Sequence, residues 1–168
     1  MSYPIHTHLY KSPVGELILG AYNDRLCLCD WTYRRMRTTI DKRIQAGLNA
    51  RYLEQSCAVI DTACSQLDEF FQQKRQQFDL PLLMVGSEFQ QSVWNGLLTI
   101  PYGDTVSYLE LAGTIGNKQA VRAVASANGA NAMSIIIPCH RVIGSNGELT
   151  GYAGGLPAKK RLLKLEQH

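Results

Sequence analysis

The stretch SIIIPCHRVIGSNGELTGYAGG, residues 134–155, joins an apolar run to a cysteine, a histidine and an arginine. Its first four residues have the composition of a short buried strand, which Pro138 ends because proline cannot donate a ladder hydrogen bond. The stretch therefore predicts a fold in which Cys139 lies at a strand end. Because neighbouring side chains of a strand point to opposite faces, Cys139 and His140 can act together only if the chain bends after Pro138 or a water molecule bridges them.

The residue types beside this thiol are those that could activate it. A free thiol has a pKa near 8.5, so only a few per cent is ionised at about pH 7 unless a base or a positive field acts on it. His140 is the nearest candidate base, and Arg141 adds a cation. Glu166 could orient His140 if PAKKRLLKLEQ, residues 157–167, is a helix that folds back. A Cys-His dipeptide also fits a cysteine with a purely structural role, and the residues alone leave both interpretations open.

A glycine-rich segment follows the motif, with Gly144, Gly147, Gly151, Gly154 and Gly155. The spacing predicts a turn-rich loop. The pattern GxxxxGK[ST] is absent, so the loop does not have the layout of a phosphate-binding loop. Because the backbone of paired glycines can approach a ligand closely, we interpret the loop as the wall of a pocket for a planar, neutral ligand.

Three short helices are predicted upstream of the motif. Ser87 caps the first, residues 87–100, whose inward positions are Phe89, Val93, Leu97 and Leu98. Ser107 can cap the second, SYLELAGTI, which stops at Gly116-Asn117. The third, KQAVRAVASANGAN, ends near Gly129 and is crowded with small residues around Arg122. Two short helices joined by a tight turn are typical of a helix-turn-helix, although any αα-hairpin shares this pattern.

The first eighty residues predict an α/β unit with a small antiparallel sheet. Residues 14–31 contain two apolar stretches around Asn23-Asp24 and indicate a hairpin. Residues 57–76 show one apolar helical face, whereas the charged segment 32–51 indicates a loop or a short helix. FDLPLLMVGS, residues 78–87, reads as a short strand and a linker. We therefore predict an α/β (α+β) fold with an N-terminal domain over 1–83 and a mostly helical C-terminal domain over 84–168.

Composition limits the classes of protein that the chain can belong to. It has 168 residues, of which 45% are hydrophobic and 18% charged, with a net charge of +3. This weakly basic balance allows a nucleic-acid partner without demanding one. The apolar runs are far shorter than the roughly 20 residues that span a bilayer, and the first residues lack a signal-peptide pattern. The odd count of five cysteines argues against a disulfide framework. We expect a cytoplasmic protein with no membrane partner.

The motif and its flanks resemble one known family. IIIPCHRVIG, with Asn131 eight residues before the cysteine and GYAGG after it, is similar to the O6-alkylguanine-DNA alkyltransferases, the methylated-DNA–protein-cysteine methyltransferases. FQQSVWNGLLTIPYGDTVSYLELA and QAVRAVASANGAN look like helical segments of this family. The resemblance is close over residues 88–166, and residues 1–80 match only in general style.

The resemblance implies a reaction and a set of roles. The alkyl group of O6-alkylguanine, and less readily of O4-alkylthymine, would pass directly to Cys139 without a cofactor, and each molecule would react once. His140 would deprotonate the thiol through water, Glu166 would polarise His140, Asn131 would brace the bend, and Tyr108 would help to turn the nucleotide out and donate to the base. Contacts to DNA or to the base would come from Arg122, which replaces the flipped base in the stack, and from Asn128, Arg141, Val142, Ser145, Tyr152, Ala153 and Gly154.

The expected partner is double-stranded DNA, bound through its minor groove with one alkylated base flipped out, by a monomer. Position 153 is Ala where some relatives carry Ser, a change that a backbone contact survives. Some relatives bind zinc in the N-terminal domain, and the pairs at His6, His8, Cys27 and Cys29 could be imagined as ligands. Their spacing does not match a zinc pattern, so no metal is expected.

Two other functions remain as alternatives at this point. A Cys-His hydrolase or acyltransferase would turn over and need an oxyanion hole. A DNA-binding regulator would need base-reading side chains on the helix that contains Arg122, where small residues dominate.

Overall fold

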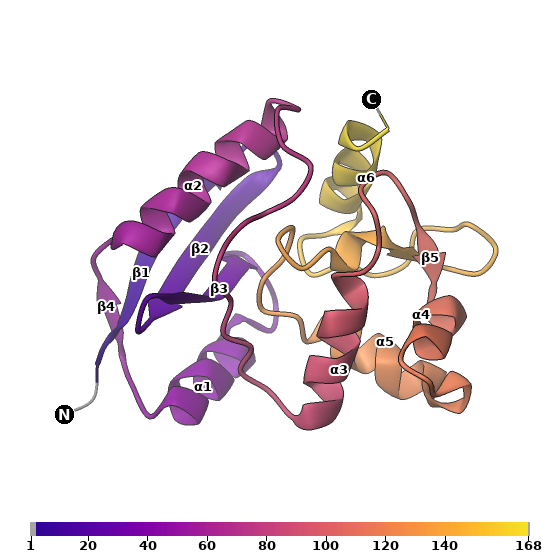
Figure 1. The fold of residues 1–168 in the computed structure, drawn as a ribbon, viewed down its shortest axis with the longest axis horizontal. Helices are drawn as coiled ribbons and strands as arrows, with labels where there is room; N and C mark the ends of the chain where they lie inside the picture. The colour runs from indigo at the N-terminus through magenta and orange to yellow at the C-terminus, as the bar shows by residue number, and fades with distance from the viewer. Residues whose placement is uncertain (1–2, 168) are drawn as a thin grey trace. The chain divides into compact units, whose positions relative to one another are not determined.

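The computed structural model describes residues 3–167. The chain divides into two compact units, Met1–Gly86 and Ser87–His168, which Figure 1 shows as a sheet-containing unit and a helical unit. Mixed α+β architecture of this kind confirms the predicted fold class.

The N-terminal unit is built on a four-stranded sheet with the order β3-β2-β1-β4. β1 (Ile5–Ser12), β2 (Gly15–Tyr22) and β3 (Arg25–Trp31) are antiparallel neighbours, and the short β4 (Tyr52–Glu54) pairs with β1 in parallel. The predicted β2–β3 hairpin is confirmed, because Asn23 and Asp24 turn the chain with φ angles of 49° and 63°. Positive φ at both central residues suits a two-residue turn whose twist matches that of the strands.

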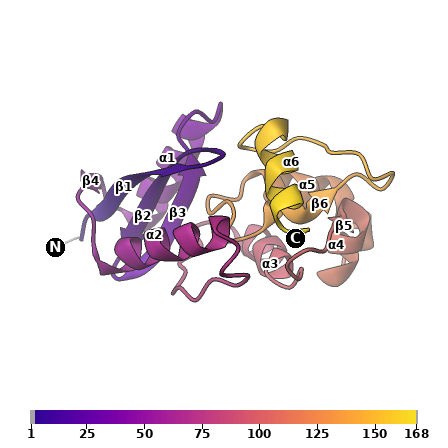
Figure 2. The ribbon, with the colours of Figure 1, turned by 90° about the horizontal axis from the view of Figure 1, so that it is seen from above.

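Helices lie on both sides of this sheet, as Figures 1 and 2 show. α2 (Ala58–Phe71) packs against β1, β2 and β3. The predicted apolar face of α2 is buried at Val59, Ile60, Ala63, Leu67 and Phe70. α1 (Arg37–Leu48) occupies most of the segment for which the charge pattern indicated a loop or short helix, and it buries only Ile40 and Ile44.

One predicted strand of the N-terminal unit is nearly absent. Within residues 78–87 only Leu82 makes a β-bridge, in parallel to Leu26. The bridge is held by hydrogen bonds from Leu26 N to Pro81 O (2.8 Å) and from Leu83 N to Leu26 O (2.8 Å). Pro81 lacks an N–H group, so pairing cannot extend through it.

The C-terminal unit packs α3 (Glu88–Leu97), α4 (Tyr108–Thr114) and α5 (Val121–Gly129) against one another. Ser87 and Ser107 both form the predicted caps, each within a capping box closed by Gln90 and Glu110. Between α4 and α5 the chain turns at Gly116, with φ of 80°, and passes through the short 3-10 helix η1 (Lys118–Ala120). The indole Nε1 of Trp94 donates to Ala127 O (2.9 Å) and ties α3 to α5. Of the positions predicted to face inward on α3, Leu98 is wrong, because it lies at the end of the helix and is 43% exposed.

The rest of this unit carries the cysteine motif. It comprises the 3-10 helix η2 (Cys139–Arg141), β6 (Val142–Ile143), which pairs in parallel with β5 (Val106–Ser107), and α6 (Leu156–Leu165). The strand predicted at Ser134–Ile137 is wrong, since these buried residues form turns. Ile135 has a φ of 73°, which no strand residue adopts. Cys139 therefore opens a 3-10 helix instead of ending a strand.

Three further findings concern the described residues as a whole. None of their helices is long and apolar enough to cross a membrane. All five cysteines are free thiols. Within residues 3–167 no three His, Cys, Asp or Glu side chains are grouped so that they could hold a metal ion, and the strands of His6 and Cys27 are separated in the sheet by β2.

Candidate active site

The bend before Cys139 is organised by the side chain of Asn131. Asn131 Nδ2 donates to Ile137 O (2.9 Å) and to Met133 O (3.4 Å), and Met133 N donates to Asn131 Oδ1 (3.0 Å). Asn131 is 1% exposed. One buried amide thus satisfies three backbone groups of the turn, which explains how an apolar run can reverse direction in the core without leaving unpaired polar groups.

The turn continues into η2, which begins at Cys139. Cys139 N donates to Ile137 O (2.8 Å), and Arg141 N donates to Pro138 O (3.0 Å). Cys139, His140 and Arg141 are all buried, with 3%, 0% and 6% exposure. The chain thus turns into η2 directly after Pro138, which was one of the two alternatives that the sequence left open.

His140 meets Glu166 in the protein interior. His140 Nε2 lies 2.8 Å from Glu166 Oε2, and both side chains are fully buried. Burial lowers the pKa of His140, and this exceeds the opposite effect of Glu166. Burial tends to raise the pKa of Glu166, but the hydrogen bonds from His140 and Arg141 lower it to about 2. The pair is therefore a neutral imidazole beside a carboxylate near neutral pH.

These protonation states decide the tautomer of His140. An ionised carboxylate only accepts hydrogen bonds, so Nε2 must carry the proton and Nδ1 the lone pair. Nδ1 is buried and has no hydrogen-bond partner within residues 3–167. The lone pair of Nδ1 is thus available to accept a proton.

Arg141 fixes the same carboxylate from the other side. Its Nε donates to Glu166 Oε1 (2.9 Å), and its outer nitrogens donate to Glu166 Oε2 (2.9 Å) and Ile100 O (2.7 Å). The guanidinium also lies 5.7 Å from the ring centre of Tyr102. Two parallel bonds between a guanidinium and a carboxylate restrict the orientation of both groups.

Lys159 is a buried cation at this site that the sequence analysis did not single out. It is 0% exposed, and its Nζ donates to Val142 O (2.6 Å) and Thr150 O (3.2 Å). Burial lowers the pKa of Lys159, and the charge of Cys139 acts in the opposite direction. Lys159 lies three and seven residues before Leu162 and Glu166, so its place on the buried stripe of α6 was the signal that could have revealed it.

The glycine-rich loop is tied to the site at Thr150. Besides the bond from Lys159, Thr150 Oγ1 lies 2.9 Å from the hydroxyl of Tyr108, the first residue of α4. Tyr108 therefore contacts the glycine-rich loop that follows β6. Val142 and Gly154 are buried, whereas Tyr152 and Ala153 are partly exposed.

The remaining predicted residues lie further from this cluster. Arg122 and Ser145 are exposed, on α5 and in the loop after β6, and Asn128 is buried with 6% exposure. Within residues 3–167, the side chains of His140 and Glu166 form no hydrogen bond with Arg122 or Ser145.

Two family models match the chain. One is "6-O-methylguanine DNA methyltransferase, ribonuclease-like domain", over residues 5–84, and the other is "6-O-methylguanine DNA methyltransferase, DNA binding domain", over residues 88–168. The chain belongs to the 6-O-methylguanine DNA methyltransferase family. The family predicted from the cysteine motif is thereby confirmed.

Relatives within the methyltransferase family match over nearly their whole length. The methylated-DNA–protein-cysteine methyltransferase of Methanosarcina mazei is 53% identical over 164 residues, which cover 98% of each chain. That of Mycobacterium leprae is 43% identical over 167 residues, 98% of this chain and 93% of the relative. The crystal structure of Mycobacterium tuberculosis OGT in complex with DNA is similar with a TM-score of 0.84 and 41% identity, covering 96% of this chain and 92% of that one.

Proposed function

We propose that this chain repairs DNA by transferring the alkyl group of O6-alkylguanine, and less efficiently of O4-alkylthymine, to the sulfur of Cys139. The reaction class is supported by relatives at 43% and 53% identity that are named methylated-DNA–protein-cysteine methyltransferases. One observation carries the assignment to Cys139. The next residue, His140, forms a buried pair with Glu166, with 2.8 Å between His140 Nε2 and Glu166 Oε2. No other cysteine among the five has a histidine as its neighbour in the sequence.

The proton path follows from the tautomer of His140. The lone pair on Nδ1 accepts the thiol proton of Cys139, directly or through one water molecule, while Nε2 remains bonded to Glu166. The imidazolium that forms is stabilised by the carboxylate. Glu166 stays ionised because its pKa is about 2, so it orients and stabilises His140 without taking the proton itself.

Alkyl transfer then breaks one bond and forms another. The thiolate attacks the alkyl carbon, a carbon–sulfur bond forms, and the bond between that carbon and guanine O6 breaks with its electron pair left on the base. A hydrogen bond from Tyr108 stabilises this developing negative charge, and protonation yields guanine. The thioether is not hydrolysed, so each molecule reacts once and no cofactor is consumed.

Access to a thiol that is 3% exposed requires the base to leave the duplex. Enzymes that act on a base inside DNA extrude it at a cost of a few kcal/mol. The surface of α5 supports a role in this step, because Arg122, Ala123, Ser126 and Gly129 are all exposed on it. Such small residues allow close approach to the minor groove, and Arg122 fills the gap that the displaced base leaves.

The same proposal gives the domains and the assembly. The C-terminal domain, residues 84–168, contains every residue of the Cys139 cluster and carries out DNA binding and transfer. The N-terminal domain is an α/β unit over 1–83. Because one chain supplies the complete cluster, the protein acts as a monomer, and we place it in the cytoplasm.

Intact-protein mass spectrometry tests the proposal. Incubation with duplex that contains O6-methylguanine is expected to add the mass of one methylene group to one molecule of protein, and peptide mapping is expected to find it on Cys139. The variant Cys139→Ala is expected to bind the same duplex and remain unmodified. Repeated turnover of a thioester substrate would instead support a hydrolase, and binding without an adduct would support a regulator; either result would overturn the proposal.

A further inference from the structure

The N-terminal unit concentrates its positive charge in one segment. Residues 32–51 contain six Lys or Arg and one acidic residue, Asp41, whereas the rest of residues 3–86 contains four Lys or Arg and eight Asp or Glu. A basic segment in an otherwise acidic unit marks one part of its surface for an anionic partner.

The carboxylates near this segment are already used by two of its arginines. Asp41 accepts from Arg37 Nη2 (2.7 Å) and from the hydroxyl of Tyr52 (2.7 Å). Asp30, which is fully buried, accepts from Arg34 (3.2 Å) and Arg37 (2.8 Å). Arg34 and Arg37 therefore serve internal ion pairs.

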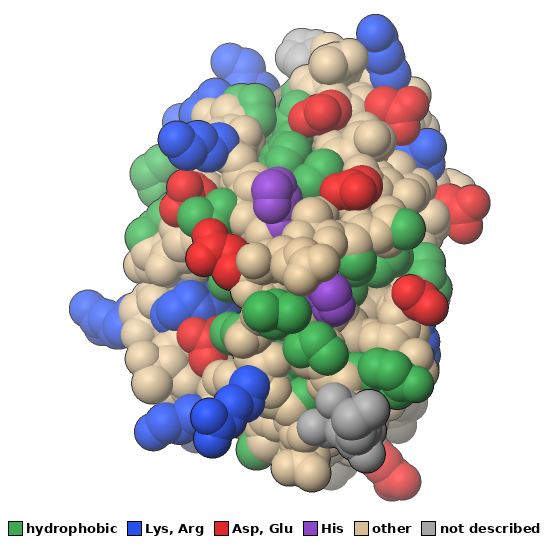
Figure 3. Space-filling view, turned by 90° about the vertical axis from the view of Figure 1, so that its left-hand side faces the viewer, with side chains coloured by type: hydrophobic (Ala, Val, Ile, Leu, Met, Phe, Trp, Pro, Cys, Tyr) green, Lys and Arg blue, Asp and Glu red, His purple; other side chains and the backbone are tan. Residues whose placement is uncertain are grey.

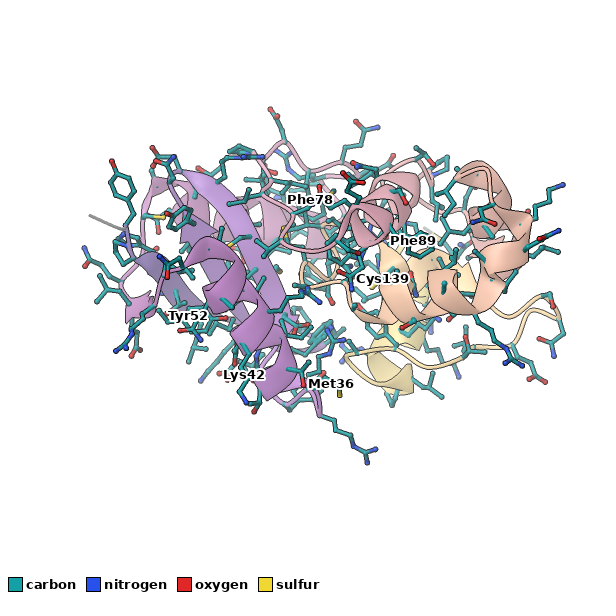
Figure 4. All side chains as sticks on the ribbon, turned by 90° about the horizontal axis from the view of Figure 1, so that it is seen from below. Met36, Lys42, Tyr52, Phe78, Phe89 and Cys139 are labelled. Atoms are coloured by element: carbon teal, nitrogen blue, oxygen red, sulfur yellow. The ribbon has the colours of Figure 1, made fainter. Side chains whose placement is uncertain are left out.

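Of the four other cations in residues 32–51, Arg43 is half-buried, whereas Arg35, Lys42 and Arg51 are exposed. The helix buries Ile40 and Ile44. A stripe at helical spacing is exposed on the opposite side, formed by Thr38, Thr39, Lys42 and Ala46 of α1, with Arg35 before the helix and Asn49 at its C-cap. The stripe contains no acidic residue. No salt bridge from Arg35, Lys42 or the exposed Arg51 is found within residues 3–167. We call Arg35, Lys42 and Arg51 the α1 basic surface; Lys42 is labelled on α1 in Figure 4.

An open groove of about 930 Å³ borders two of these three cations. Lys42 and Arg51 line it together with Tyr3, Tyr52 and Leu53, and its lining includes no Asp or Glu. In Figure 3, Lys and Arg side chains gather at the lower left of the face and also at its upper left. The groove and the stripe thus have the same electrostatic character.

We propose that the α1 basic surface binds the phosphate backbone of duplex DNA, as a contact additional to that made by the C-terminal unit. The inference rests on the proposed function in one respect, that duplex DNA is the polyanion the protein meets. The chemistry favours DNA over an acidic protein, because hydroxyl and amide donors between the cations are typical phosphate ligands. α1 has 12 residues, so it is about 18 Å long, the axial span of roughly five phosphates of one strand.

The salt dependence of binding tests this contact. Affinity for an unmodified 24-bp duplex is measured by fluorescence anisotropy at several salt concentrations, for the full chain and for R35Q/K42Q. The slope of log K against log salt is negative, and each lost phosphate contact reduces its magnitude by about 0.9. We therefore expect the magnitude of the slope to be smaller by roughly one to two in R35Q/K42Q than in the wild type, with weaker binding at low salt.

A matched variant distinguishes the effect of losing the α1 basic surface from the effect of lowering the net charge. K11Q/K74Q removes two exposed cations of the same unit, outside residues 32–51, and is expected to keep the wild-type slope. Equal slopes for the wild type and R35Q/K42Q, or equal changes in both variants, would overturn the proposal. Circular dichroism checks that each variant is folded.

A failure of this inference differs from a failure of the proposed function. Methyl transfer to Cys139 from free O6-methylguanine base does not involve the phosphate backbone, so R35Q/K42Q is expected to react with the free base at the wild-type rate. Loss of the adduct in the wild-type protein would refute the proposed function, whereas an unchanged salt slope with a normal adduct would refute only the α1 contact.

Discussion

Arg141 binds the carboxylate of Glu166, and His140 is hydrogen-bonded to the same carboxylate. Arg141 holds Oε1 through Nε and Oε2 through an outer nitrogen, each at 2.9 Å, and His140 Nε2 lies 2.8 Å from Oε2. Three nitrogens therefore converge on one buried carboxylate, and the base beside the thiol is oriented by a group that cannot rotate freely.

This geometry predicts a loss of stability in acid. The pKa of Glu166 is about 2 in the folded chain and 4.5 in an ordinary environment. Because the pKa is lower in the folded chain, ionised Glu166 adds on the order of 3 kcal/mol to the free energy of unfolding. This contribution is fully present above about pH 4.5 and is lost as the pH falls toward 2. Urea denaturation across this range is expected to show the fall in the wild type and a flatter profile in Glu166→Gln. Identical profiles for both would contradict the role of this carboxylate.

Glu166→Gln is also expected to slow alkyl transfer near pH 7, by roughly 10²-fold or more, because the imidazolium loses its counter-charge. The deficit is expected to shrink as the pH rises, since solvent hydroxide then deprotonates Cys139 without help. Stopped-flow transfer rates between pH 6 and 10 measure this, with Glu148→Gln as an exposed control. A deficit that stays constant with pH would indicate a purely structural role for Glu166.

Lys159→Met is expected to slow transfer and to loosen the loop after β6. The carbonyls of Val142 and Thr150 both lose their bond to Nζ, and an unsatisfied buried acceptor costs about 1–3 kcal/mol. Lys160→Met changes the next residue of α6, which is exposed, and is expected to behave as wild type. Hydrogen exchange over residues 142–155 and single-turnover rates compare the two variants. Similar exchange in both would refute the tie between α6 and the loop.

Arg122→Ala is expected to affect duplex substrates more than the free base. Filling the gap left by a flipped base matters only when there is a stack, so transfer from O6-methylguanine in duplex is expected to fall by about tenfold or more while attack on the free base is unchanged. Parallel rate measurements on the two substrates decide the matter. Equal losses on both would remove the stack-filling role.

Local signals were enough to predict much of the fold. The capping boxes at Ser87 and Ser107 depend on a residue three positions away, and the Asn23-Asp24 turn depends on two adjacent residues, so short windows of sequence contain the necessary information. The family resemblance supplied the pairing of His140 with Glu166, 26 residues apart, which spacing alone left as a guess.

The features missed by the sequence analysis depend on distant contacts. The run Ser134–Ile137 has strand-like composition, but the amide of Asn131 captures its backbone and favours turns. Lys159 looks like one of several surface cations in a basic helix. Its spacing from Leu162 and Glu166 is a weak signal, and the packing of α6 against η2 shows that it is buried. The parallel strand β4 is three residues long, too short for a periodic pattern to show.

The backbone conformation of Ile135 limits which amino acids the turn at residues 134–137 can accept. Its φ of 73° lies in a region that β-branched residues rarely enter, at a cost of about 1–3 kcal/mol, while its side chain is 1% exposed in the core. Glycine at this position would relax the backbone but leave a void, whereas valine or leucine would occupy the space and retain the torsion. We expect a saturation library to find position 135 among the least permissive in the C-terminal unit, because no standard amino acid meets both demands at once.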